Sequence, residues 1–111
     1  MSEEEQRQKM EDLRQAISEQ LPLGSSPEPV EALIQQQGIE DFTTSGPTTG
    51  ADSTLKRERP DLVNQMRYIT GAVIRDVYRG IWVSESIHLR FYYDEDRKLI
   101  WSIVRSVATG P

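Results

Sequence analysis

The N-terminal part of the chain carries apolar residues at helical spacing. Between residues 3 and 21 they recur at intervals of three and four, on one stripe of a helix: Met10, Leu13, Ile17 and Leu21. Ser2 and Glu5 fit a capping box at the start of this segment. Pro22 ends it, because the residue before a proline is pushed out of the α region. The pattern therefore predicts an amphipathic helix over 3–21.

A second, shorter helix is predicted over 27–37. Its apolar stripe consists of Val30, Leu33 and Ile34. Gly38 is suited to the left-handed residue that ends a helix. The next polar segment, 43–54, contains Ser, Thr, Gly, Pro and Ala with a single Asp, which predicts an exposed flexible loop.

A glycine and two serines precede the second helix, which invites a phosphate-binding interpretation. A helix N-terminus binds phosphate through its free backbone N–H groups, and Pro27 and Pro29 lack two of them. The stretch is therefore interpreted as a helix start. Either Ser26 caps the helix ahead of Pro27, or Ser25 and Glu28 form a capping box.

β-branched and aromatic residues alternate with polar ones over 66–107, which predicts a three-stranded antiparallel meander. In its clearest strand, the face expected to cover the core carries Ile81, Val83, Glu85, Ile87, Leu89, Phe91 and Tyr93. The opposite face carries Trp82, Ser84, Ser86, His88, Arg90 and Tyr92. After a polar turn at 94–98, strict alternation puts Leu99, Trp101 and Ile103 on the core face, with Tyr93 facing Leu99.

The first strand of the meander is predicted over 68–78. An alternative stays open, because some apolar positions also fit a helical stripe: Leu62, Met66, Ile69, Val73 and Val77. The high content of β-branched residues favours the strand.

The composition is that of one small globular domain, 1–111, with 36% hydrophobic and 28% charged residues. The absence of cysteine excludes disulfides and thiolate chemistry. No apolar run is long enough to span a bilayer, and the acidic N-terminus does not have the pattern of a secretory signal. We expect a cytoplasmic protein without membrane contact. The alternative is an exported protein whose signal has been removed.

The net charge of −5 is unevenly spread along the chain. Residues 1–53 carry eleven acidic and three basic side chains, whereas the remainder carries seven acidic and ten basic ones. Phosphate contacts need clustered Lys and Arg, so nucleic acid is not expected as a partner.

The candidate catalytic and metal-binding residues are few. The carboxylates at 94–96 fit a polar turn better than a calcium loop, because the central glycine and the distal glutamate of such a loop are missing. His88 is the only histidine, and no nucleophile pairs with it along an extended strand. No nucleotide-binding, nucleophile-elbow or zinc motif is present. The sequence predicts neither an enzyme nor a cofactor or metal site.

One set of residues suggests binding of another protein. Trp82, His88, Arg90 and Tyr92 share the sheet face away from the helices, with Ile100 and Val104 expected beside them. Aromatic residues and Arg are enriched at the centres of protein interfaces. The alternative is that the N-terminal helix or the 43–54 loop covers this face within the monomer.

The run Leu23-Gly24-Ser25-Ser26, followed by Val30, Leu33 and Ile34, resembles the start of a helix in the small SmpA/OmlA-like outer-membrane lipoproteins. The run from Leu89 to Leu99 is similar to a strand, acidic turn and returning strand of that family, with Arg97 where such turns usually carry Gly. The resemblance implies an α-α-β-β-β layout, shared with small inhibitor domains of β-lactamases, that serves as a protein-binding scaffold. The family's lipidation cysteine is missing, so membrane anchoring is not implied for this chain.

The sequence therefore predicts an α+β domain with two N-terminal helices packed on one face of a three-stranded antiparallel meander. The expected function is binding of another protein, as an inhibitor, immunity-type or accessory factor in a bacterial cytoplasm, with a homodimer left open. The alternatives are an envelope-assembly protein of the OmlA-like kind lacking its export signal, and a small-ligand-binding domain.

Overall fold

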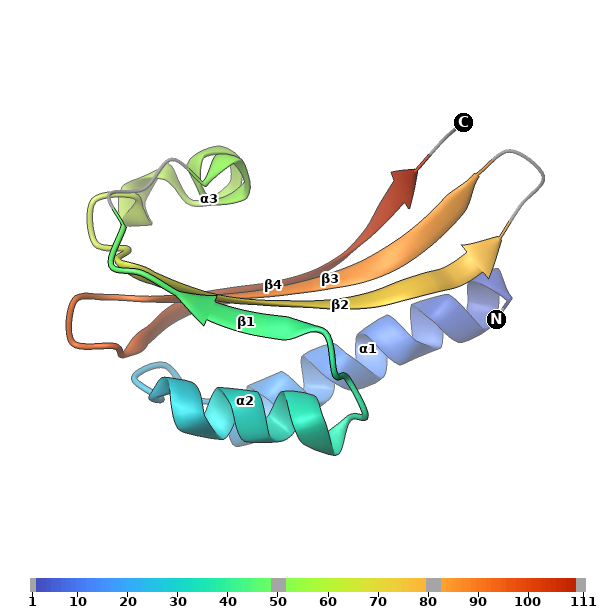
Figure 1. Cartoon of the computed structure of the whole chain (residues 1–111), viewed down its shortest axis with the longest axis horizontal. Helices are drawn as coiled ribbons and strands as arrows, with labels where there is room; N and C mark the ends of the chain where they lie inside the picture. Colours follow the sequence, from blue (N-terminus) through green and yellow to red (C-terminus); the bar gives the residue numbers. More distant parts are fainter. Residues whose placement is uncertain (1, 49–51, 80–82, 110–111) are drawn as a thin grey trace.

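Helices lie on both faces of one antiparallel sheet in the computed structural model, which describes residues 2–48, 52–79 and 83–109 (Figure 1). The elements in chain order are α1 (Glu3–Gln20), α2 (Pro27–Gln36), β1 (Phe42–Ser45), α3 (Ser53–Glu58), the 3-10 turn η1 (Pro60–Leu62), β2 (Tyr68–Arg79), β3 (Ser84–Tyr93) and β4 (Leu99–Thr109). The α+β class is confirmed. The described part of the sheet has four strands in the order β1-β2-β3-β4, so the prediction of three was wrong.

The first two helices begin where the cap residues predict. The Ser2 hydroxyl accepts a hydrogen bond from the backbone N–H of Glu5 at 3.1 Å, and the Glu5 side chain returns the contact, which confirms the capping box of α1. Ser26 occupies the N-cap position of α2, with Pro27 at the first helical position, but its side chain makes no capping hydrogen bond. The alternative capping box of Ser25 is wrong, because the Ser25 hydroxyl donates to the carbonyl of Pro22 at 2.6 Å.

The hairpin register agrees with the prediction, and β2 is a strand rather than a helix. Tyr93 pairs with Leu99 across β3 and β4. Along β2, Ala72 pairs with Leu89 and Ile74 with Ile87, so the apolar residues of both strands share the face that α1 and α2 cover.

The predicted flexible loop at 43–54 was wrong, because this segment contains β1 and the start of α3. Thr44 explains why β1 forms on the edge of the sheet. Its hydroxyl donates to Glu31 of α2 and lies 2.6 Å from the hydroxyl of Thr70 on β2, which in turn lies 2.8 Å from the hydroxyl of Tyr93. These contacts give the buried hydroxyls of Thr70 and Tyr93 their hydrogen-bond partners. Residue composition does not show that Thr44 is needed for this.

A β-bulge in β4 overturns the predicted faces of that strand. The register passes from Tyr93 opposite Leu99 to Tyr92 opposite Trp101, so Ile100 is an extra residue. Because side chains alternate with a period of two, one inserted residue moves every later side chain to the opposite face. Trp101 and Ile103 therefore lie on the α3 side, and Val104 lies on the α1 side, each opposite to the prediction.

The sheet consequently has a buried cluster on each face. The larger cluster lies under α1 and α2 and includes Leu13, Ile17, Val30, Ile34, Ile87, Leu89, Phe91 and Tyr93. The smaller cluster lies under α3 and consists of Leu55, Leu62, Met66 and Tyr92, with Val63, Ile69, Ile100, Trp101 and Ile103 packed against it.

Candidate protein-binding face

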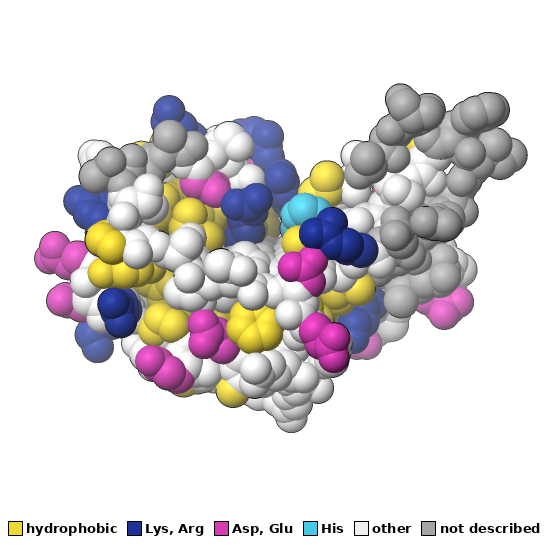
Figure 2. All heavy atoms as spheres, in the orientation of Figure 1, with side chains coloured by type: hydrophobic (Ala, Val, Ile, Leu, Met, Phe, Trp, Pro, Cys, Tyr) yellow, Lys and Arg dark blue, Asp and Glu magenta, His cyan; other side chains and the backbone are white. Residues whose placement is uncertain are grey.

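The face of the sheet opposite α1 and α2, called the open face below, is only partly covered. α3 lies over one end of it, while beyond α3 the strands bend towards the side of the sheet on which α3 lies (Figure 1). Figure 2 shows a hollow between these two parts, with the only histidine, His88, at its edge. The alternative, in which the 43–54 loop covers this face, is not what the structure shows: the cover is α3 and η1, which lie mostly after residue 54, and residues 43–45 belong to β1 at the sheet edge.

Asp52 attaches α3 to the open face. Its carboxylate accepts hydrogen bonds from the Arg90 guanidinium at 2.8 Å, the Tyr92 hydroxyl at 2.8 Å and the backbone N–H of Leu55 at 2.9 Å. The last of these bonds caps α3. Only 8% of the Asp52 side chain is exposed, against 35% for Arg90, so both the carboxylate and part of the guanidinium are shielded from water. One residue thus starts the helix and holds it on the sheet.

The four residues predicted to contact a partner differ in their structural environments. Tyr92 is fully buried under α3, where its ring stacks on Trp101 with 5.6 Å between the ring centroids. That position removes Tyr92 from the surface, and its pKa is raised above the ordinary value by burial and by the bond to Asp52. His88 and Arg90 are partly exposed on the open face. Trp82 lies outside the described residues.

A groove of about 310 Å³ runs across the uncovered part of the open face. The lining residues that belong to the open face come from β1, β2 and β3: Thr43, Ser45, Ile69, Gly71, Val73, His88 and Arg90. Gly71 pairs with Thr43 on one side and Arg90 on the other, so it lies between two groove-lining residues. A Cβ placed on Gly71 would meet no atom within 4 Å. The missing side chain leaves room above the sheet, as glycine often does where another group approaches a strand.

Positive charge surrounds His88 on this face. Burial lowers the pKa of His88 below its ordinary value of 6.5, and three nearby positive charges lower it further: Arg90, Arg105 and Arg75. His88 is therefore neutral at pH 7. Arg75 is paired with Asp41 at 2.9 Å in an exposed ion pair, which makes only a small contribution to stability.

Arg105 is a residue of this face that the sequence pattern did not single out. It pairs with His88 across β3 and β4, and its Nε is buried without a hydrogen-bond acceptor among the described residues. If the predicted alternation of Leu99, Trp101 and Ile103 is continued by one step, position 105 falls on the core face. A charged residue at an expected core position was the signal that the side chains of this strand change from one sheet face to the other.

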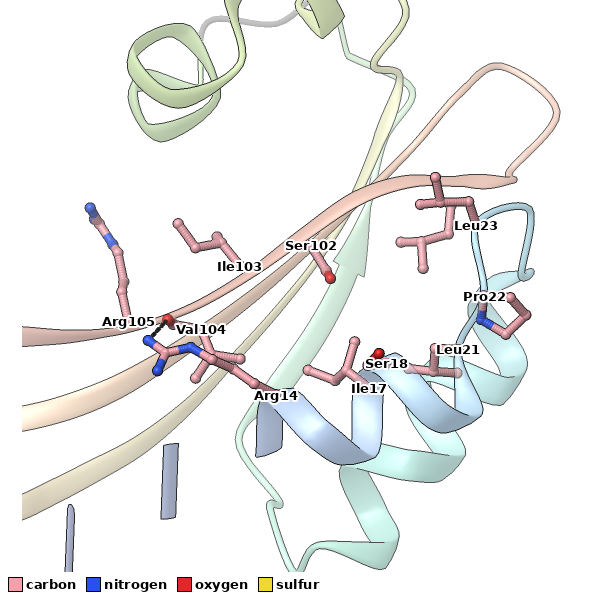
Figure 3. Close-up of a pocket in the computed structure, with 11 residues that line it drawn as sticks. Arg14, Ile17, Ser18, Leu21, Pro22, Leu23, Ser102, Ile103, Val104 and Arg105 are labelled. Carbon is pink, nitrogen blue, oxygen red and sulfur yellow. Dashed lines mark hydrogen bonds between the residues drawn. The ribbon is translucent and has the colours of Figure 1, made fainter. Parts of the chain in front are cut away.

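A larger cavity of about 660 Å³ lies between α1 and the free edge of β4 (Figure 3). Its walls are mainly aliphatic and include Ile17, Leu21 and Ile103. Arg14 reaches across it and donates to the carbonyl of Val104 at 2.9 Å, which occupies one hydrogen-bonding group of the strand edge. Figure 3 shows Arg105 on the other side of β4 from Arg14.

The acidic turn forms the structure that its residues favour. The Asp94 carboxylate accepts from the backbone N–H groups of Asp96 and Lys98, at 2.9 and 3.0 Å. Arg97 adopts a left-handed conformation with φ of 59°, the position where a glycine is common. Within residues 2–48, 52–79 and 83–109, no three acidic or histidine side chains gather where they could hold a metal ion.

Comparisons with known proteins found no match for this chain among family models, curated proteins or solved structures. The SmpA/OmlA-like resemblance therefore stays a prediction. None of the helices in the described ranges combines the length and the apolar character needed to cross a membrane.

Proposed function

We propose that the chain is a small non-enzymatic module that binds another protein through the open face, as an inhibitor, immunity-type or accessory factor. The observation that carries this proposal is the groove over Gly71. It is lined by apolar side chains from β2 together with His88 and Arg90 from β3. A shallow surface with an apolar floor and Arg at its side is typical of a protein interface rather than of an enclosed small-molecule pocket.

The composition of the groove also argues against catalysis as its purpose. His88 is suited to general acid–base chemistry, and Arg90, Arg105 and Val73 lie beside it on this face. Ser86 is on the same face, two residues before His88, which is about 7 Å along an extended strand. General base catalysis needs an acceptor group that orients the imidazole and a nucleophile within reach. Protein binding can use His88 and the arginines without an orienting acceptor and without a nucleophile.

Gly71 offers a direct test of the proposal. Because a Cβ there meets open space and no left-handed φ is required, Gly71→Ala and Gly71→Leu should both fold. Replacing a strand glycine usually raises stability, by about 0.5 to 1 kcal/mol. The leucine side chain would fill the groove between Thr43 and Arg90, whereas the alanine methyl would leave most of it empty.

The experiment is affinity capture from cells of the source organism with wild type, Gly71→Ala and Gly71→Leu, after thermal unfolding has shown that all three are folded. We expect a stoichiometric protein partner held by wild type and by Gly71→Ala and lost from Gly71→Leu. A partner held equally by all three would move the binding site away from the open face. Finding no partner under any condition would contradict the proposed function.

A further inference from the structure

The open face carries a local excess of positive charge on an acidic protein. Three arginines surround His88, namely Arg75, Arg90 and Arg105. Two carboxylates face them, since Asp41 pairs with Arg75 and Asp52 pairs with Arg90. Because His88 is neutral and the whole chain has a net charge of −5, this patch differs in sign from the rest of the molecule.

Arg105 is the unsatisfied member of this group. No described residue accepts a hydrogen bond from its buried Nε, and no described carboxylate forms an ion pair with it. Buried donors in native proteins are almost always bonded, either to protein or to ordered water, and an acceptor group of a binding partner can take the same place. A guanidinium is best satisfied by a carboxylate or a phosphate, which match its planar fork of donors.

Near Arg105, the Arg90 guanidinium has further N–H donors besides the one bonded to Asp52. Its Nη1 is bonded to Asp52, while a guanidinium has five N–H groups. Arg90 and Arg105 flank His88 from the same strand and from the neighbouring strand, respectively. An anionic group above His88 would therefore meet donors from both β3 and β4, next to the space over Gly71.

We propose that the partner presents an acidic loop to the open face, and that an aspartate or glutamate carboxylate of this loop binds Arg105 and Arg90 beside His88. This inference rests on the proposed function and names the chemistry of its partner. Nucleic acid is disfavoured as the source of the anion, because three arginines make few phosphate contacts and residues 1–53 carry eleven acidic side chains.

His88 provides a specific readout, since it is the only histidine and its imidazole resonance needs no assignment. The probe is a capped acidic peptide of alternating Asp and Glu, compared with its Asn and Gln counterpart, and binding is followed by NMR. A carboxylate next to the imidazole stabilises the protonated form, so the acidic peptide should raise the pKa of His88. The neutral peptide should leave this pKa unchanged.

Arg105→Gln should weaken binding of the acidic peptide by about tenfold, a loss typical of one charge-assisted contact. Arg105→Lys should restore part of the affinity, which separates loss of charge from loss of fold. Lys98→Gln is the matched control, because it removes one positive charge at the exposed turn between β3 and β4. It should bind as wild type does.

Four binding results would overturn the inference: no response at millimolar acidic peptide, equal binding of the neutral peptide, full affinity in Arg105→Gln, or tighter binding of oligothymidylate of equal charge. A fifth result concerns the free protein. A concentration-dependent shift of His88 without peptide would instead identify a second copy of this chain as the source of the acidic group, and would overturn the assignment to a different partner. The two proposals fail separately. A captured partner that ignores Arg105→Gln contradicts only the acidic loop, whereas peptide binding without any captured partner contradicts the proposed function.

Discussion

Replacing Asp52 with alanine tests the attachment of α3 to the sheet. The substitution removes the N-cap of α3, which typically costs about 1 kcal/mol. It also leaves the buried Tyr92 hydroxyl without its acceptor, at a further cost of about 1 to 2 kcal/mol. The lost ion pair adds about 1 kcal/mol or less, because Arg90 remains partly hydrated. We therefore expect Asp52→Ala to lower the free energy of unfolding by about 3 kcal/mol.

A loss of this size is readily measured. Small domains have unfolding free energies of about 5 to 15 kcal/mol, so the variant should lose a large fraction of its stability. Urea unfolding followed by tryptophan fluorescence is the suitable measurement, since Trp101 stacks on Tyr92 directly beneath α3. Tyr92→Phe removes only the hydroxyl and should cost about 1 kcal/mol. The two losses should not add, because both variants break the same hydrogen bond.

Asp61→Ala is the control for a change of charge in the same part of the chain. Asp61 pairs with Arg59 at 2.9 Å, and both side chains are exposed. This variant should unfold at the urea concentration of wild type, since exposed ion pairs contribute little. If Asp52→Ala unfolds no more easily than Asp61→Ala, Asp52 does not hold α3 on the sheet, and the assignment of the covered end of the open face is wrong.

Three further predictions concern pH and packing. Burial raises the pKa of Tyr93 to about 12; because the folded value exceeds the ordinary 10.0, the unfolding free energy should fall as pH rises from about 10 towards 12, measured by urea unfolding at each pH. The pKa of His88 is lowered in the folded protein, so the contribution of neutral His88 to the free energy of unfolding should be present above pH 6.5 and lost as the pH falls through the folded pKa. An NMR titration midpoint at or above 6.5 would contradict the crowding of His88 by arginines. Leu13→Ala should cost about 2 to 5 kcal/mol because Leu13 is 1% exposed, whereas Leu23→Ala should have almost no effect on thermal unfolding because Leu23 is 73% exposed.

Much of the fold follows from patterns with a fixed period. Helical spacing identified α1 and α2, and the local chemistry of Ser2, Glu5 and Ser26 located where they begin. The alternation of β3 identified the residues under the helices, and Tyr93 opposite Leu99 followed from the polar turn between them. These features are local, so a short window of sequence contains what determines them.

The segment containing β1 and α3 was missed because its stability comes from distant residues. Thr44 and Thr70 share a hydrogen bond from strands separated by more than twenty residues, and Asp52 bonds to β3. A composition rich in Ser, Thr and Gly indicates loops on average, and tertiary contacts override such averages. One usable signal was present: Asp52 is a strong N-cap residue ahead of Leu55, and Leu62 and Met66 supply further apolar side chains nearby.

The candidate site was predicted only in part for a related reason. Alternation along β3 placed His88 and Arg90 on the open face, but it contained no information on the cover over Tyr92. Arg105 depends on the bulge at Ile100, and three successive apolar residues, Leu99 to Trp101, were the visible break in the alternation. A strict period would have put the Arg105 guanidinium on the core face, where burial of a charge without a partner is costly.

The two irregular features, the bulge and the Asp52 cap, together determine what the open face presents. The bulge turns Trp101 and Ile103 towards α3, where they pack against the buried cluster under this short helix, and puts Arg105 on the open face beside His88. Asp52 then fixes α3 over the aromatic end and neutralises Arg90 in part, so the uncovered charge lies around Arg105. Without the bulge, Ser102 and Val104 would face α3 in place of Trp101 and Ile103, and Arg105 would leave the open face. The inserted residue therefore determines both the packing of β4 under α3 and the presence of Arg105 on the open face.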